Sequence, residues 1–373
     1  MLKGFYLSLY VGPALPVPAP QAVIDALTAA QVTVTAGQAS GFQLTFALSK
    51  GSVLTTALLP VGFFDPGTRV ILAVSLNNVA HIIMDGVITQ QTVAPSNDPG
   101  QSTLTVTGQD LSLLMNLEPK EMEYPGCDTT MCVNLVLLQY IWRGIVPAVV
   151  PPLEVDFPNP LDQYMVQSST DLEFVQQAAT EAGYVFYLEP GPLPGANIAY
   201  FGPEIRVGVP QPALSINMDA ESNVEALSFT YDGMAREQPV ITVYDPITGL
   251  IPIDIPIPDV SLLRPPLAVR PATAMKKKRL DDVANVNPIK AALLGLAAAS
   301  KPDAITGSGQ LDVLRYGQPL KARGLVGVRG AGTSYDGLYY VSSVTHMIKR
   351  GEYKQSFSLA REGLISLTPV VPV

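Results

Sequence analysis

The sequence has few of the residues on which most metal and redox sites depend. Its 373 residues include two cysteines, two histidines and one tryptophan. Cys127 and Cys132 lie in the stretch GCDTTMC with no histidine nearby, whereas a structural zinc site takes four ligands. We therefore expect no metal and no cofactor. Two free thiols in a reducing compartment are expected, and a local disulfide is the alternative.

Long hydrophobic runs are also missing. The apolar run at residues 145–150 is interrupted by Pro147 and is far shorter than the roughly 20 residues of a membrane helix. The N-terminal stretch lacks the small-residue cleavage site of a signal peptide. We predict no stable membrane insertion and no secretion signal. Because 47% of the residues are hydrophobic and only 15% are charged, we expect much of the surface to contact other proteins.

Positive charge is scarce. The formal net charge is -9, and the one basic cluster runs from Lys276 to Arg279. Proteins that bind nucleic-acid phosphates present basic patches or stripes, so we predict no specific nucleic-acid binding. Four adjacent basic residues are more typical of the solvated start of an exposed helix.

No catalytic constellation can be assembled from sequence motifs. The chain has no G-x-S-x-G elbow, no H-E-x-x-H helix and no phosphate-binding glycine loop. His81 and His346 lie in strand patterns, which favours structural roles. Glu121 and Glu123 remain an alternative carboxylate pair for glycoside cleavage. Trp142 is predicted to be a core or interface anchor, with a ligand platform as the alternative.

Residues 1–118 have the pattern of a strand-rich domain. Several stretches alternate apolar and polar residues, as half-buried antiparallel strands do: residues 32–35, 42–46, 82–93 and 103–107. Glycine, proline and asparagine pairs separate them as turns. Asp110 is expected to cap a short helix over residues 111–117. This spacing predicts a small barrel or sandwich.

Residues 119–205 are predicted to form a mixed α/β middle domain. Thr170 and Glu173 have the spacing of a capping box, so a helix should begin at Asp171 and end at Gly183. Residues 184–188 and 198–201 then read as two strands. A second helix is expected over residues 131–142, because apolar residues recur there at three- and four-residue steps.

Residues 206–373 return to strand patterns and carry an insertion at about 246–305. Strands are predicted at residues 214–216, 224–231, 240–244, 310–314, 325–328, 338–349 and 353–359. Residues 246–273 contain seven prolines, which favours extended segments lying along a neighbouring surface. Two helices are predicted at about 273–285 and 288–299. The similar ends of the two strand-rich blocks, residues 102–114 and 354–367, suggest that one barrel-like module is used twice.

Two stretches carry a resemblance to a known family. In residues 167–202 a polar cap, an Asp-x-x-Phe helix start, a Glu-x-Gly helix end and an aromatic strand match at Gln167, Asp171, Phe174, Ala178, Glu181, Gly183, Tyr184, Phe186 and Tyr187. In residues 337–364 a closing hairpin matches at Tyr339, Val341, His346, Gly351, Tyr353 and Arg361. The chain here resembles the baseplate hub proteins of contractile tails, which include the phage late control protein D family and the hub portion of type VI secretion spike proteins.

The resemblance implies a mainly β protein in which two tube-like β-barrel domains flank the α+β middle domain. It implies a homotrimer whose six tube-like domains join a sixfold tail tube to a threefold spike. The expected partners are a tail tube protein, a separate spike protein and other baseplate proteins, the last through residues 246–305. The expected location is the virion tail baseplate, after synthesis in the host bacterial cytoplasm. The matching positions are structural signatures, so no catalysis is expected.

Two other functions compete with this interpretation. A tail-associated cell-wall hydrolase would need an acid and a base in a cleft, for which Glu121 and Glu123 are the candidates. A receptor- or glycan-binding tail module would present aromatic residues in loops, whereas Tyr184, Tyr187, Tyr339 and Tyr340 lie in strand patterns.

Overall fold

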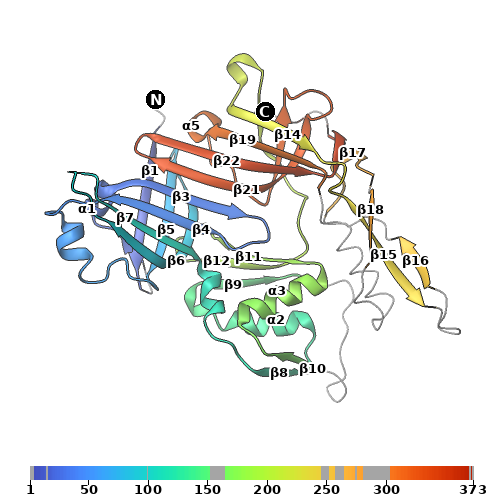
Figure 1. The fold of residues 1–373 in the computed structure, drawn as a ribbon, viewed down its shortest axis with the longest axis horizontal. Coiled ribbons are helices and arrows are strands. Elements are labelled where there is room, and N and C mark those ends of the chain that lie inside the picture. The colour runs from blue at the N-terminus through green and yellow to red at the C-terminus, as the bar shows by residue number, and fades with distance from the viewer. Residues whose placement is uncertain are drawn as a thin grey trace.

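The protein is mainly β, as the sequence predicts, and the longer helices of the described residues lie in the middle of the chain (Figure 1). The structure is a computed structural model that describes residues 4–13, 16–98, 100–151, 164–244, 252–256, 264–273, 275–279, 303–368 and 371. Strands group into one large sheet and several small ones.

A sheet of 13 strands forms the centre of the fold. Its strands from the first block are β1 (Phe5–Gly12), β2 (Val17–Pro18), β3 (Leu27–Thr35), β4 (Gly41–Ala47), β5 (Arg69–Leu76), β6 (Val79–Ala94) and β7 (Thr103–Asp110). Those from the last block are β13 (Gln211–Ser215), β14 (Val224–Tyr231), β19 (Ile305–Asp312), β20 (Leu325–Arg329), β21 (Gly337–Lys349) and β22 (Glu352–Arg361). The order along the main path is β14-β19-β22-β21-β3-β4-β7-β6-β5-β1-β2, and β13 and β20 extend from β21.

The two strand-rich blocks are joined through β3 and β21, which pair antiparallel. Val34 lies opposite Val344, and the hydroxyl groups of Thr33 and Thr345 are 3.2 Å apart. The two blocks therefore share one continuous sheet. The sequence pattern predicts a barrel-like module used twice and does not predict that the two modules pair with each other. Domain limits at residues 118 and 205 remain a prediction.

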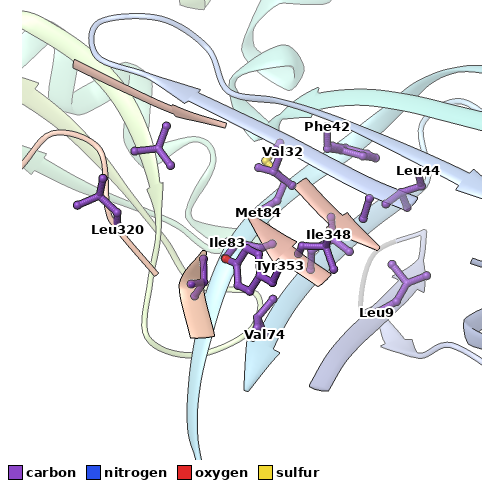
Figure 2. Packing of buried hydrophobic residues seen from close by; sticks show 14 of the residues in the cluster. Leu9, Val32, Phe42, Leu44, Val74, Ile83, Met84, Leu320, Ile348 and Tyr353 are labelled. Carbon is purple, nitrogen blue, oxygen red and sulfur yellow. The ribbon is translucent and has the colours of Figure 1, made fainter. Parts of the chain in front are cut away.

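One hydrophobic core also spans both blocks. Figure 2 shows Val32 and Phe42 of the first block in the same cluster as Ile348 and Tyr353 of the second. In β4 the residues that alternate inward, Phe42, Leu44 and Phe46, are all buried. Burying each such side chain contributes about 1.5–3 kcal/mol, so this shared core stabilises the two blocks together.

The middle segment has its own core and small sheets. β8 (Met122–Pro125) pairs with β10 (Tyr164–Gln167), and a three-stranded sheet has the order β11 (Val185–Pro190), β12 (Asn197–Gly202), β9 (Ile145–Val149). Helices α2 (Thr129–Leu138) and α3 (Asp171–Ala182) lie in this segment, with 3-10 helices Leu111–Asn116 and Ile141–Arg143. Asp110 caps Leu111–Asn116 as predicted, because its carboxylate accepts the Ser112 amide at 3.0 Å.

The predicted limits of α3 are confirmed. The Thr170 hydroxyl accepts the Glu173 amide at 3.2 Å, and the Glu173 carboxylate accepts the Thr170 amide at 3.3 Å. Both partners of the capping box therefore form, which satisfies two amides at the start of the helix. Gly183 ends the helix with φ +68°, a left-handed conformation that glycine adopts without steric cost.

The second predicted helix is shorter than expected. α2 ends at Leu138, followed by the 3-10 helix Ile141–Arg143 and by Gly144 with φ +83°. Val133, Val136 and Leu137 are buried, whereas Ile141 is 50% exposed and Trp142 is 70% exposed. Of the two anchor roles predicted for Trp142, the core anchor is therefore wrong, and the interface anchor stays a prediction. The Arg143 guanidinium lies 3.9 Å from the centre of the Trp142 ring.

The insertion contains strands where helices were expected. β18 (Lys276–Arg279) pairs parallel with β15 (Glu237–Tyr244), which also pairs with β16 (Pro252–Pro256). The predicted helix at 273–285 is thus wrong for residues 276–279, because main-chain pairing with β15 outweighs the charge pattern. The rest of that helix beyond 279 and the helix at 288–299 lie outside the described residues.

The described residues 264–273 lie along the last block, as the extended segment was predicted to do. Here β17 (Ala268–Pro271) pairs with β23 (Gly363–Ser366), and Leu267 and Ala268 are buried. Four short helical turns complete the described elements: α1 (Gln21–Ala26), the π-helix Leu54–Leu58, the 3-10 helix Asp219–Glu221 and α5 (Val313–Tyr316). The predicted strand at 310–314 ends early, because Asp312 caps α5.

Candidate functional site

The first group of family-matching residues forms a buried polar cluster at the start of α3. Gln167 is fully buried, accepts the Tyr124 hydroxyl at 2.8 Å and donates to Asp171 at 2.7 Å. Asp171 also accepts the Tyr140 hydroxyl at 2.6 Å and pairs with Lys120. Burial and the bond to Asp171 raise the pKa of Tyr140, so it stays a hydrogen-bond donor. The cluster joins β8, β10, the turn after α2 and the start of α3.

The other matching positions near α3 are packing residues. Phe174 is buried and stacks on Tyr124 with ring centres 5.7 Å apart. Tyr184 lies edge-on to Phe201 at 5.6 Å, and Tyr187 lies beneath the Arg323 guanidinium at 4.0 Å. These contacts account for the aromatic pattern without a ligand.

The matching residues of the closing hairpin form a second buried cluster. Gly351 has φ +76° in the turn between β21 and β22, which explains why glycine stands there. His346 Nδ1 lies 2.7 Å from the Tyr353 hydroxyl and 3.2 Å from the Gln355 side-chain nitrogen. Burial disfavours the charged ring, so the histidine is neutral in the folded protein near neutral pH. Burial lowers the pKa of His346 to about 4.

We expect His346 to make stability depend on pH between about 4 and 6.5. Between these pH values the unfolded chain binds a proton at His346, whereas the folded chain keeps the buried ring neutral. Stability therefore falls as the pH drops through this window. The loss is about 3 kcal/mol, at about 1.4 kcal/mol for each unit of pKa. Urea unfolding of the wild type and of His346→Gln at several pH values measures it. Parallel curves for the two proteins would contradict the expectation.

Among the matching residues, Arg361 is the one arginine or lysine, and its side chain is fully buried. It is 0% exposed and donates to the main-chain carbonyls of Gly363, Ser334 and Asp336 at 2.8, 2.8 and 3.0 Å. Its guanidinium lies 4.2 Å from the ring centre of Tyr339, which is also fully buried. Arg361 therefore fixes the end of β22 to the loop before β21.

Sequence reasoning missed the cations that join the segments. Arg323 donates to Leu188 O of β11 at 3.2 Å and to Thr35 O of β3 at 3.1 Å, so it connects all three parts of the chain. Arg69 of β5 pairs with Asp85 of β6 and donates to main-chain carbonyls of the middle segment. Main-chain carbonyls have no residue-type signature, so no sequence pattern marked either arginine.

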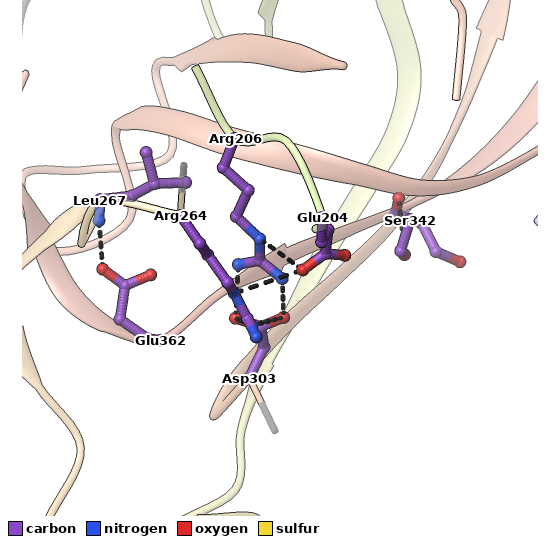
Figure 3. Close-up of polar contacts among 8 residues, drawn as sticks. Glu204, Arg206, Arg264, Leu267, Asp303, Ser342 and Glu362 are labelled. Atoms are coloured by element: carbon purple, nitrogen blue, oxygen red, sulfur yellow. Dashed lines mark hydrogen bonds and ion pairs between the residues drawn. The ribbon is translucent and has the colours of Figure 1, made fainter. Parts of the chain in front are cut away.

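A third cluster holds the insertion against the last block (Figure 3). Arg206 is 3% exposed and donates to Asp303 at 2.6 and 2.8 Å and to Glu204 at 3.1 Å, while Arg264 pairs with both acids. Glu362 accepts the main-chain amide of Ala268 at 2.6 Å. Each buried charge has partners from a distant part of the chain, which is the arrangement of a structural network.

The candidate catalytic carboxylates lie on the surface, at and just before an exposed strand. Glu121 precedes β8 and Glu123 lies within it, and both are exposed. Among the described residues, no three His, Cys, Asp or Glu side chains are grouped as metal ligands, and no helix is long and apolar enough to cross a membrane.

A continuous apolar stripe lies on the outer side of α2 and the turn after it. Met131, Leu135 and Leu138 are 48%, 46% and 50% exposed, and Ile141 and Trp142 continue the stripe. Because α2 also buries Val133 and Val136 on its inner side, it is apolar on both sides. Such a helix is typical of a surface that a protein partner covers.

Several strand edges of the large sheet have no neighbouring strand among the described residues, including those of β2, β13 and β14. β14 is the last strand at one end and pairs only with β19. In β6, pairing with β5 stops at Val87, so residues 89–94 pair only with β7. Both segments are mostly exposed, and neither contains the proline or lysine that commonly protects an edge.

Solved structures to which this chain is similar include tail proteins. Over 97% of this chain and 98% of the other, it matches a tail protein from Neisseria meningitidis MC58 with a TM-score of 0.62 and 15% identity. A 43 kDa tail protein of prophage MuSo2 from Shewanella oneidensis gives 0.61 and 14% over 96% and 99% of the two chains. The fold is that of phage tail proteins.

A component of a bacterial secretion system has a similar fold. An Escherichia coli protein described as a component of the type VI secretion system matches with a TM-score of 0.53 and 13% identity, over 93% of this chain and 78% of the other. That protein is itself described as structurally similar to two T4 bacteriophage tail proteins. No protein-family model and no curated sequence match this chain. Because the sequence identities are only 13–15%, these matches confirm the predicted resemblance to tail hubs at the level of the fold.

Proposed function

We propose that this protein is a structural baseplate hub of a contractile phage tail or related injection system, and that it acts without catalysis. The observation that carries the proposal is that β14 and residues 89–94 of β6 are exposed edges in a sheet of the phage tail fold. The buried charged clusters support it, because each has partners within the chain and none is directed at a ligand.

The free edges favour a ring of identical chains. β14 lies at one end of the main path of the sheet, whose other end is β2, and residues 89–94 of β6 extend past β5 as a further edge that pairs only with β7. Pairing β14 of one copy with β6 of the next is a head-to-tail contact, which forms a closed ring when the rotation between copies allows it. Three copies would place six strand-rich blocks around the axis, which suits a sixfold tube above a threefold spike.

The proposed partners follow from this role. A tail tube protein would meet one face of the ring and a separate spike protein the other, at the virion tail baseplate. Other baseplate proteins would contact the apolar stripe of α2 and the insertion. Within the insertion, residues 264–273 already pack on the last block, so β16 and β18, together with β15 with which both pair, are the described segments left for such contacts.

We expect the purified chain to form a trimer, alone or on addition of its spike protein, and a proline in the free part of β6 to prevent it. Neighbouring amides of a strand point in opposite directions, so one of the two adjacent residues Gln91 and Thr92 directs its amide at β7 and the other directs its amide at the free edge. The informative variant places proline at the residue whose amide faces the free edge, because it removes a donor to the next copy and keeps the pairing with β7. That variant should unfold like the wild type and remain a monomer by light scattering. Its neighbour, which loses an amide bonded to β7, is the matched control and should be destabilised. A stable wild-type monomer with spike present would contradict the proposal.

A further inference from the structure

Two thiols occupy the positions of a hydrophobic staple at the start of α2. Asp128 is the N-cap: its carboxylate accepts the Met131 amide at 2.7 Å, and its carbonyl accepts the Cys132 amide at 3.0 Å. Cys127 comes directly before the cap, and Cys132 is the fourth residue of the helix. Side chains at these two positions pack against each other across the first turn. The cap therefore places the two side chains next to each other, and Cys127 contributes to the raised pKa of the Cys132 thiol.

The two thiols differ in access. Cys132 is 0% exposed in the core of the middle segment, whereas Cys127 is half-buried at its edge. Burial raises the pKa of the Cys132 thiol to about 12, and the neighbouring Cys127 adds to this increase. A reagent from solution therefore meets Cys127 first, and Cys132 is placed to react with the sulfur of Cys127.

We propose that Cys127 and Cys132 are a redox-active dithiol that small disulfides, such as glutathione disulfide, convert to an intramolecular disulfide. The Cys127 thiolate attacks one sulfur of the small disulfide and releases one small thiol, which leaves a mixed disulfide on Cys127. The Cys132 thiolate then attacks the Cys127 sulfur and releases the second small thiol. The cysteines lose two electrons, the small disulfide gains them, and the two cysteine protons end on the released thiols.

The buried thiol makes the second step the slow one. Cys132 must lose its proton before it attacks, and its raised pKa keeps the thiolate scarce near neutral pH. The mixed disulfide on Cys127 therefore accumulates briefly and closes faster as the pH rises. Closure links the residue before the cap to the first turn of α2, directly beneath the exposed Met131 of the apolar stripe. This inference does not depend on the proposed hub function.

The experiment treats the full-length reduced chain with glutathione disulfide and digests the unfolded, alkylated product. An endoproteinase that cuts before Asp128 separates Cys127 from Cys132, so the two fragments stay together only when a disulfide joins them. We expect the linked fragments from the wild type, a transient glutathione adduct on Cys127, and a closing rate that increases with pH. The linked form should also unfold at a higher temperature than the reduced form.

Two variants make the result decisive. Cys127→Ser should give no linked fragments and leave Cys132 unreacted, and Cys132→Ala should keep the glutathione adduct on Cys127 permanently. A wild-type chain that stops at the adduct, that leaves both thiols free, or that forms only disulfides between chains would overturn the proposal. None of these outcomes bears on ring formation, which light scattering measures separately.

Discussion

Arg69→Met is expected to destabilise the protein by about 3–5 kcal/mol, the cost of leaving a buried charge without its partner. Arg69 donates to both oxygens of Asp85 at 2.8 and 2.7 Å, and both residues are buried. Without Arg69, the Asp85 carboxylate keeps only the Asn197 amide, at 2.8 Å. Urea unfolding, followed by tryptophan fluorescence and circular dichroism, measures the loss.

The same change should loosen the contact between the first block and the middle segment. Arg69 also donates to Arg143 O at 2.9 Å and Gly195 O at 3.0 Å, and both carbonyls belong to the middle segment. Trp142 lies next to Arg143, so its fluorescence should report an earlier transition than circular dichroism does. Two transitions in place of one would show that this contact couples the segments.

A double-mutant cycle separates the ion pair from simple loss of packing. Adding Asp85→Asn to Arg69→Met removes the unpaired charge and should recover part of the lost stability. Lys50→Met, in an exposed turn, is the matched control and should change stability by less than about 0.5 kcal/mol. Purely additive effects of the two substitutions would contradict the role assigned to the pair.

The parts of the fold that the sequence predicted are those encoded by neighbouring residues. The capping box of Thr170 and Glu173 and the left-handed Gly183 fix α3 within a few positions, so its limits were predicted correctly. The alternation in residues 224–231 likewise identified β14 with its exact bounds. Gln167 and Asp171 were singled out, and the structure joins them in one buried cluster.

The parts that were missed depend on contacts between distant residues. Alternation tells which side of a strand is buried but does not name its neighbour, so the pairing of β3 with β21 was out of reach. The stretch from Met131 to Trp142 is apolar on both sides, so its periodicity identified the buried Val133 and Val136 but also placed the exposed Ile141 on the same face. The cations Arg69 and Arg323 bind main-chain carbonyls, which every residue possesses.

Arg361→Met is expected to cost about 3–5 kcal/mol, because it leaves main-chain carbonyls without a donor inside the core. Arg361 is the donor to Gly363 O, Ser334 O and Asp336 O, and no solvent reaches its side chain. Unpaired carbonyls at this depth each cost about 1–3 kcal/mol, and release of the buried charge offsets part of the sum. Urea unfolding measures the loss, and hydrogen exchange should show it first at the end of β22.

Arg361→Lys tests whether the planar guanidinium or the charge is required. A lysine ammonium is a compact donor that cannot replace a guanidinium fork directed at carbonyls on different segments. The lysine variant should therefore lose most of the stability that the methionine variant loses. Arg315→Met, which removes an exposed arginine from α5, is the matched control and should unfold like the wild type. A lysine variant as stable as the wild type would show that charge alone holds the closing strand to the loop before β21.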